Sequence, residues 1–188
     1  MAASIEPIPV TVTYLGMRTP PAHYPPLPLN AHIALLKSRA MPRHFYRYLM
    51  DRVGRQWHWV NVLRLDDAAL DARLSEPDRE ITTLYLDGAP AGFFEIAPHA
   101  HDIGELHFFG LMPHATGQGL GRWFLGAAIQ AAWATNPKSI VVQTCTLDHP
   151  AALPLYQKLG FEPLGQSKEI ITPMSHEERA RVLARARP

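Results

Sequence analysis

The residues whose types and spacing most directly suggest chemistry lie between Pro113 and Arg122. Three glycines occupy alternate positions there, at Gly117, Gly119 and Gly121, between an expected strand and an expected helix. Glycine lets the backbone turn sharply and approach a ligand closely, with its N–H groups pointing outward. The first turn of the following helix adds unpaired N–H donors and a partial positive charge, so this loop would suit a diphosphate group. A glycine-rich connection that binds no ligand is the alternative.

The spacing of these glycines excludes two common nucleotide-binding loops. No Gly-Lys-Ser or Gly-Lys-Thr ending is present, as a Walker-type phosphate loop requires. Glycines at positions 117, 119 and 121 also do not fit the G-x-G-x-x-G fingerprint of dinucleotide-binding domains. A Walker-type NTPase and a Rossmann dinucleotide site are therefore not expected.

Together with its surroundings, the loop resembles the signature of the GNAT superfamily of acyl-CoA-dependent N-acyltransferases. That signature is Gln/Arg-x-x-Gly-x-Gly/Ala after the family's fourth strand, and Gly119 and Gly121 match its glycines. Downstream, residues 148–161 are similar to the family's Asp-Asn-Pro-x-Ala-x-x-Leu-Tyr-x-x-x-Gly-Phe segment. The resemblance covers residues 80–165 and implies the GNAT fold, an α/β structure with a mixed, mostly antiparallel sheet and helices on both faces.

The resemblance implies a site for acetyl-CoA, the acyl donor, and no metal. Thr116 stands where the family has Gln or Arg, which predicts weaker coenzyme binding. His149 stands where the family has Asn, and it can still form one hydrogen bond. The residues that the resemblance assigns to coenzyme binding are Leu111, Met112, Thr116, Gly117, Gln118, Gly119, Leu120, Gly121, Arg122, His149 and Tyr156.

Acyl transfer to an amine requires a base that accepts the proton of the amine, a hydrogen-bond donor to the carbonyl oxygen and an acid that protonates the departing thiolate. The resemblance assigns the acid to Tyr156, for which simple aromatic packing is the alternative. It assigns the donor to a backbone N–H around Gly110 and Leu111.

The base has three candidates. The resemblance points to Glu105, at the start of the family's fourth strand, acting through water. Strand alternation predicts Glu105, His107 and Phe109 on one face, so His107, whose ordinary pKa is near the working range, is the second candidate. Glu95 on the preceding strand is the third. The alternative is that Glu105 is a solvated strand end and His107 a core histidine.

Three further features have a plainer interpretation beside a chemical one. Cys145 is expected to be a small buried side chain rather than a nucleophile. His99, His101 and Asp102 could bind a metal, but no fourth ligand is evident. An aromatic cluster could wall a pocket for an apolar or cationic acceptor, or pack helices on the sheet; its members are Trp57, His58, Trp59, Phe45, Tyr46 and Tyr48.

The elements that must position these residues follow from hydrophobic spacing. Meander strands followed by strand–helix–strand imply a mixed sheet covered by helices. A capping box, Ser175 with Glu178, opens a polar C-terminal helix that we expect to be solvated. Strands are expected at 10–15, 81–86, 92–96, 105–112, 140–145 and from 161, and helices at 31–36, 45–53, 66–74, 120–134 and 151–159.

The prolines suggest a boundary near residue 30. Seven of the 18 prolines precede it, and each fixes φ and removes a backbone donor, so a long helix or a central strand is not expected there. We therefore expect residues 1–30 to be a surface extension with one strand. Residues 31–174 would form the acyltransferase domain, with its motif-bearing core at 80–165, and residues 175–188 the polar helix.

The composition narrows the class of protein. Eighteen Lys and Arg against 17 Asp and Glu leave a net charge of +1, which supplies no basic field for nucleic acid. A single cysteine excludes an internal disulfide framework. No apolar run approaches the roughly 20 residues of a membrane helix, and the N-terminus lacks the pattern of a signal peptide, so a cytoplasmic protein is expected.

Two hypotheses remain. The first is an N-acetyltransferase that acts on a small amine or on an exposed amino group of a peptide or protein. Because family members are frequently dimers, a homodimer is a further expectation. The alternative is a catalytically impaired acyl-CoA-binding or regulatory module, which the changes at Thr116 and His149 favour.

Overall fold

The computed structural model describes residues 6–28, 32–99 and 101–185. Seven strands form one sheet in the order β2-β3-β4-β5-β6-β1-β7. Neighbouring strands are antiparallel except β5 and β6, which are parallel. The mixed, mostly antiparallel sheet predicted from the sequence is confirmed. The strands are β1 (Ile8–Met17), β2 (Ile33–Lys37), β3 (Glu80–Leu86), β4 (Ala89–His99), β5 (Ile103–Leu111), β6 (Ser139–Cys145) and β7 (Glu162–Ile171).

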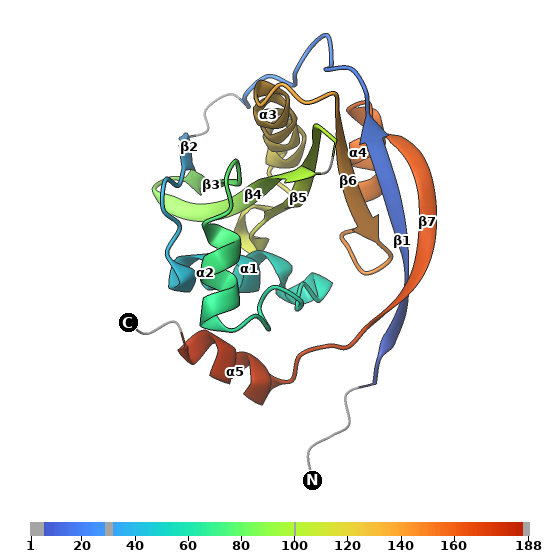
Figure 1. Cartoon of the computed structure of the whole chain (residues 1–188). Coiled ribbons are helices and arrows are strands. Elements are labelled where there is room, and N and C mark those ends of the chain that lie inside the picture. The colour runs from blue at the N-terminus through green and yellow to red at the C-terminus, as the bar shows by residue number, and fades with distance from the viewer. Residues whose placement is uncertain (1–5, 29–31, 100, 186–188) are drawn as a thin grey trace.

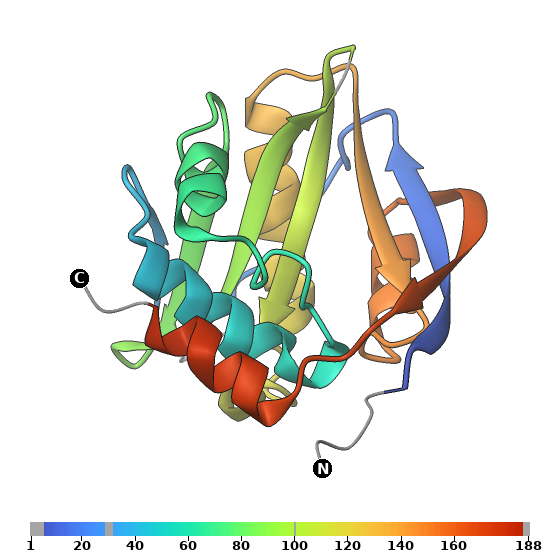
Figure 2. The ribbon, with the colours of Figure 1, turned by 60° about the horizontal axis from the view of Figure 1, so that its bottom comes forward.

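Helices cover both faces of this sheet (Figures 1 and 2). One face carries α1, α2 and α5, and the other carries α3 and α4. Within the described ranges, no helix is both long and apolar enough to cross a membrane. The helices are α1 (Arg43–Gly54), α2 (Asp67–Leu74), α3 (Leu120–Ala134), α4 (Ala152–Lys158) and α5 (His176–Ala184), with short 3-10 turns η1 (Arg55–Trp57) and η2 (Pro113–Ala115).

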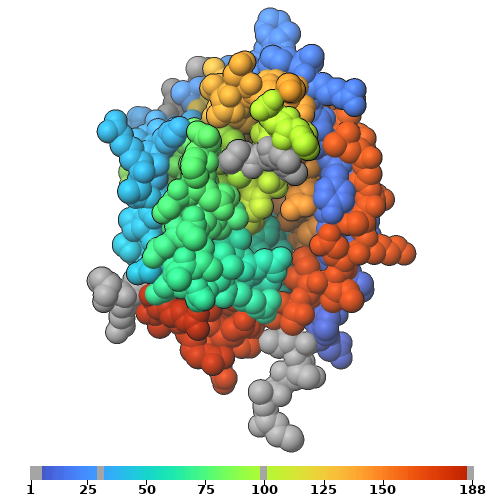
Figure 3. All heavy atoms as spheres, viewed as in Figure 1, coloured from blue at the N-terminus to red at the C-terminus, as the bar shows by residue number. Residues whose placement is uncertain are grey.

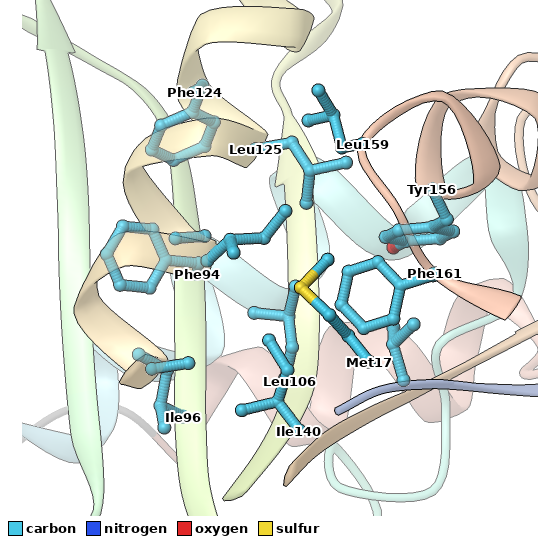
Figure 4. Close-up of a cluster of buried hydrophobic side chains, with 14 of the residues drawn as sticks. Met17, Phe94, Ile96, Leu106, Phe124, Leu125, Ile140, Tyr156, Leu159 and Phe161 are labelled. Atoms are coloured by element: carbon cyan, nitrogen blue, oxygen red, sulfur yellow. The ribbon is translucent and has the colours of Figure 1, made fainter. Parts of the chain in front are cut away.

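Each face has its own hydrophobic core. The core under α3 and α4 joins strand residues such as Leu106 and Ile140 to Phe124 and Leu125 of α3, and Figure 4 shows these side chains converging. The core under α1 and α5 includes Leu49 and other side chains of α1, with Phe93 from β4. The central strands β4 and β5 are therefore buried on both faces of the sheet. This packing holds in place the strands that border the candidate site.

The N-terminal strand lies inside the sheet, which the prolines argued against. β1 pairs with β6 over Val12–Met17 and with β7 over nearly its whole length. Pro9 lies beyond the stretch that pairs with β6, so its missing N–H interrupts no pairing with that strand. The expected strand at 10–15 is therefore present, but as an interior strand rather than part of a surface extension. The boundaries proposed for the domains stay a prediction.

The proline-rich segment after β1 does run over the surface, across α3 (Figure 1). Tyr24 packs against the core beneath α3. A Cβ added to Gly126 of α3 would lie 2.6 Å from Cδ of Pro25, closer than real side chains approach. The segment and α3 can therefore touch only because residue 126 has no side chain.

One of the predicted elements is of a different type in the structure. The helix expected at 31–36 is the edge strand β2, which pairs with β3 from Ile33↔Leu86 to Lys37↔Thr82; residue 31 lies outside the described residues. A short apolar run fits a helix or a strand equally well, and pairing with β3 decides this one. Expected helix 120–134 is found with the same bounds in α3.

The C-terminal helix is capped as predicted but is not simply solvated. The Ser175 hydroxyl accepts from the N–H of Glu178 at 2.9 Å. Arg179 is 8% exposed and donates to the carboxylate of Asp51 on α1 at 2.7 Å, while Val182 is buried. Helix α5 therefore packs on α1. One arginine of its Arg-rich sequence is not solvated but forms a buried ion pair with α1.

Candidate active site

The site begins where two parallel strands separate. β5 and β6 pair only from Ile103↔Ser139 to Leu106↔Val142, and beyond that point they diverge. A cavity of about 590 Å³ lies in the gap, lined by the second half of β5, the end of β6, residues 57–62, the glycine-rich loop, α4 and the end of β7. Figure 3 shows the hollow between the yellow-green β5 and the orange β6.

The glycine-rich loop is held by its own side chains. Thr116 Oγ1 donates to the carbonyl of Pro113 at 2.8 Å, and Gln118 Nε2 donates to the carbonyl of His114 at 2.8 Å. Gly117 and Gly119 both have φ of +76°, the left-handed region that favours glycine. Because no side chain among the described residues caps α3 at Gly119, the N–H groups of its first turn are available to a ligand.

The loop leaves room at the start of α3 for a closely approaching group, such as the diphosphate that the sequence suggests. Gly121 lines the cavity, and a Cβ placed there would meet only Leu111 and Leu155, each at 3.9 Å, which is ordinary contact. Protein packing therefore does not require a glycine at 121, whereas the close approach of a ligand to the helix start would. The Thr116 hydroxyl donates its hydrogen bond within the loop. It therefore does not supply to a ligand the hydrogen bonds that the Gln or Arg of the GNAT signature would supply.

The residues assigned to coenzyme binding divide between the cavity and its supports. Leu111, Thr116, Gly117, Gly121, His149 and Tyr156 line the cavity. Met112 and Leu120 are buried at 2% exposure, and Arg122 lines a separate hollow beside the proline-rich segment. Gln118 and Gly119 shape the loop from outside the cavity wall.

A bulge in β5 changes which candidates share a face. Glu95 pairs with Phe108 and the next residue of β4 pairs with Leu106, so β5 carries one extra residue at His107. Phe109 consequently packs in the α3 core against Phe124, with ring centroids 5.1 Å apart. The prediction that strand alternation places Phe109 with Glu105 and His107 is wrong, because alternation is interrupted at the bulge.

Glu105 and His107 do meet. His107 Nδ1 lies 2.8 Å from Oε1 of Glu105, and both side chains are partly buried. The His107 ring packs edge-on against Phe108 with centroids 4.6 Å apart, and His107 lines the cavity while Glu105 stands behind it. The pair can therefore accept a proton at His107 and stabilise the resulting charge through Glu105.

Glu95 lies elsewhere. It is fully buried and does not line the cavity, and it accepts hydrogen bonds from the hydroxyl of Tyr46 and from Arg73, each at 2.5 Å. Arg79 forms a further ion pair with it. Burial and the charge of Glu95 raise the pKa of Tyr46. Glu95 therefore pairs with Tyr46 and two arginines outside the cavity, and it does not face the place where an amine would react.

Tyr156 has the burial and protonation state that an acid needs. It lines the cavity at 6% exposure, packed edge-on against Phe109 and Phe161. Burial, followed by the charge of Asp148, raises the pKa of Tyr156 well above its ordinary value. Its phenol is therefore protonated throughout the neutral range.

Comparison with known proteins agrees with this geometry. The sequence profile of the Acetyltransferase (GNAT) family matches residues 39–161, more than half of the chain. The chain belongs to the GNAT acetyltransferase family. No sequence among curated proteins matches it.

Solved GNAT structures share the fold at low sequence identity. A GCN5-related N-acetyltransferase from Sphaerobacter thermophilus is 13% identical, with 87% of this chain and 52% of that chain covered and a TM-score of 0.58. One from Kribbella flavida is 18% identical, with 88% and 59% covered and a TM-score of 0.54. This GNAT chain thus spans less than two thirds of the length of these solved chains.

One contact across the site of this GNAT domain was missed by sequence reasoning. Asp148 accepts from Oγ1 of Thr144 and the N–H of Cys145, each at 2.8 Å, and from Nε1 of Trp59 at 3.1 Å. Trp59 therefore ties the segment after α1 to the loop that precedes Tyr156. The only sequence signal for it is the aromatic cluster, which fits helix packing and pocket lining equally well.

Other members of that cluster also reach the cavity. The ring of Trp57 lies edge-on to His149, with centroids 5.4 Å apart. His149 Nδ1 accepts from the N–H of Ala151 at 3.1 Å, so a neutral ring carries its proton on Nε2. Burial, then the charge of Asp148, raises the pKa of Cys145, which keeps it a thiol. In the described residues, no group of three or more His, Cys, Asp or Glu could hold a metal ion.

Proposed function

We propose that this chain is an acyl-CoA-dependent N-acyltransferase that passes an acetyl group from acetyl-CoA to a primary amine by direct attack in a ternary complex. The observation that carries the proposal is the cavity between β5 and β6, which has the glycine-rich loop on one side and buried Tyr156 on another. Its backbone donors suit the diphosphate, and the gap between the strands can take an extended acyl-bearing arm.

The second half of β5 would polarise the thioester carbonyl. Beyond Leu106, no strand among the described residues pairs with the edge of β5 that faces β6, and Gly110 and Leu111 line the cavity. A backbone N–H aimed at the oxygen where charge develops stabilises the transition state without moving. A Cβ at Gly110 would lie 2.5 Å from Val53, so a glycine is needed for α1 to approach this edge.

Proton transfer falls to the side chains on either side of the gap. The neutral amine attacks the carbonyl carbon, the new C–N bond forms and the C–S bond breaks. His107, backed by Glu105, accepts the proton that the amine loses, directly or through water. Tyr156 gives its proton to the departing thiolate and regains one from solvent.

A second candidate is a module with this fold that binds acyl-CoA but does not turn over. The hydrogen bond of Thr116 to Pro113 favours it, because that hydroxyl is not offered to the coenzyme. The ordered contact between Glu105 and His107 favours the enzyme, since a binding module has no need of a proton acceptor beside the acyl group.

Release of free thiol from acetyl-CoA separates the two candidates. Across a broad panel of primary amines, we expect amine-dependent thiol release. It should fall at least about tenfold in His107→Ala, because a positioned general base typically contributes about 10²–10⁴-fold. Saturable coenzyme binding with no thiol release from any amine would support the non-catalytic module instead.

A further inference from the structure

One part of the cavity wall has a distinct chemistry. It is formed by Trp57, Trp59 and Phe108, which give it an apolar, π-rich surface. The end of β7, residues 169–171, belongs to the same cavity lining and is called the rim. Among the described residues that line the cavity, none is a lysine or an arginine. An acceptor against this part of the wall therefore meets aromatic faces and no cation.

One carboxylate on this rim is held in place by hydroxyl groups. The Tyr14 hydroxyl donates to Oε1 of Glu169 at 3.2 Å, and Ser167 Oγ donates to the same oxygen at 3.1 Å. Val12 of β1 pairs with Ser167, and Val10 with Glu169, so these side chains share the sheet face on which Val12 lines the cavity. The bonds leave Oε2 of Glu169 free of protein donors in the described structure.

The second carboxylate of the lining is already occupied. Asp148 accepts three hydrogen bonds, from the side chains of Thr144 and Trp59 and the N–H of Cys145. Glu169 is therefore the acidic group of this cavity that an acceptor can pair with. An acceptor with a carboxylate or phosphate near its amine would find no cation and would face Glu169, at an electrostatic cost.

We propose that the acceptor is a linear diamine or polyamine, with one ammonium bound by Glu169 while the amine at the other end is attacked beside His107. Alkyl segments would lie along Trp57 and Trp59, and the ammonium group favours both the carboxylate and the aromatic faces. The transfer itself is the one described above, with the C–N bond formed, the C–S bond broken and the amine proton passed to His107. This inference rests on the proposed function.

The test compares acceptors of matched length. Steady-state thiol release is measured with a series of linear diamines from putrescine upward. For each chain length, the controls are the monoamine and the ω-amino acid, which carries a carboxylate in place of the second amine. We expect kcat/KM to be highest for the diamine at the best length, about fivefold above its monoamine, the size of one partly exposed ion pair, and lowest for the amino acid.

A matched pair of variants on β7 locates the effect. Glu169→Gln should remove the advantage of the diamine and leave the monoamine unchanged, whereas Glu162→Gln, on the same exposed strand but outside the cavity lining, should leave both unchanged. Both sites are exposed, so neither change should impair folding. Binding of spermidine, followed by tryptophan fluorescence, should weaken in Glu169→Gln alone.

The possible results distinguish a failure of the polyamine assignment from a failure of the proposed acetyltransferase activity. Thiol release in which amino acids match diamines, or in which Glu169→Gln lowers diamine and monoamine alike, would overturn the polyamine assignment while the acetyltransferase stands. No thiol release with any amine, together with coenzyme binding, would contradict the proposed enzyme as well.

Discussion

Tyr156 is the side chain on which the proposed chemistry depends most. It is buried in the cavity wall, its pKa is raised by burial and by Asp148, and its ring is fixed by Phe109 and Phe161. A proton donor to a thiolate must be protonated and close to the sulfur, and the first of these conditions is met here.

Replacement of Tyr156 by Phe should therefore lower kcat by about 10²-fold, because the departing thiolate loses its acid. The dissociation constant for acetyl-CoA should change little, since the loop backbone carries that binding. Stopped-flow thiol release and calorimetry give the two numbers. Turnover equal to the wild type would remove the role assigned to this hydroxyl.

The pH dependence should carry the same signature. A raised pKa keeps the phenol protonated, so its activity as an acid is present below that pKa and lost only above it. We expect kcat to show no decline assignable to Tyr156 up to about pH 10, the ordinary value for tyrosine. An alkaline decline near pH 8 that is present in the wild type and absent in Tyr156→Phe would contradict this.

Local motifs predicted some of these side chains and missed others for a physical reason. Tyr156 and the glycines belong to short segments whose spacing is informative by itself. The bond between Trp59 and Asp148 joins residues 89 positions apart, and no local pattern specifies such a pairing. Strand alternation predicts His107 beside Glu105, but it cannot foresee the bulge at His107, which moves Phe109 to the other face of the sheet.

Among the elements, the loop and the start of α3 carry the prediction for coenzyme binding. Gly121→Val adds a side chain where the protein offers room, so the free energy of unfolding should change by less than about 1 kcal/mol. The affinity for acetyl-CoA should fall at least about tenfold, because the side chain enters the space of the diphosphate.

Gly165→Val is the matched control. Residue 165 lies on exposed β7, and a Cβ there meets nothing within 4 Å. It should leave the coenzyme affinity at the wild-type value in calorimetry. Equal affinity for all three proteins would show that the loop does not hold the diphosphate.

A second prediction concerns the contact between α3 and the proline-rich segment. Gly126→Leu would force Pro25 away from the helix, and overpacking of this kind costs about 1–3 kcal/mol. Urea denaturation should show the loss, and limited proteolysis should cut residues 18–28 faster than in the wild type. Unchanged stability and unchanged cleavage would mean that the segment does not pack on α3 in solution.

The long, strongly patterned elements were the ones that sequence could predict. α3 was predicted with its observed bounds because its apolar residues recur over 15 positions. Residues 31–36 were predicted as a helix because a short apolar run has no decisive period, and only pairing with β3 makes them part of a strand. The place of β1 between β6 and β7 likewise depends on partners more than 120 residues away.

At the scale of the whole molecule, ion pairs join the C-terminal helix α5 to α1 and to the segment that follows α1. Arg64, after α1, donates to Glu178 of α5 at 2.7 Å, and Arg179 of α5 donates to Asp51 of α1. The hydrogen bond from Arg64 lowers the pKa of Glu178. A lowered pKa means that this contribution to stability is present at neutral pH and lost as the pH falls.

Acid should therefore weaken the attachment of α5. We expect the free energy of unfolding to fall as the pH drops below about 4.3, the ordinary pKa of glutamate, and to fall less steeply in Arg64→Gln. Because Glu178 lies at the surface, high salt should reduce the difference between the two proteins. Identical acid slopes for both proteins at low salt would contradict the assignment.

The central claim is that the gap between β5 and β6, with the glycine-rich loop at its edge, is built to hold acetyl-CoA. Titration calorimetry of acetyl-CoA into the full chain tests it most directly. We predict saturable binding at one site per chain, abolished or strongly weakened in Gly121→Val and retained in Gly165→Val. The absence of any binding heat at millimolar acetyl-CoA, with the protein folded, would contradict the claim.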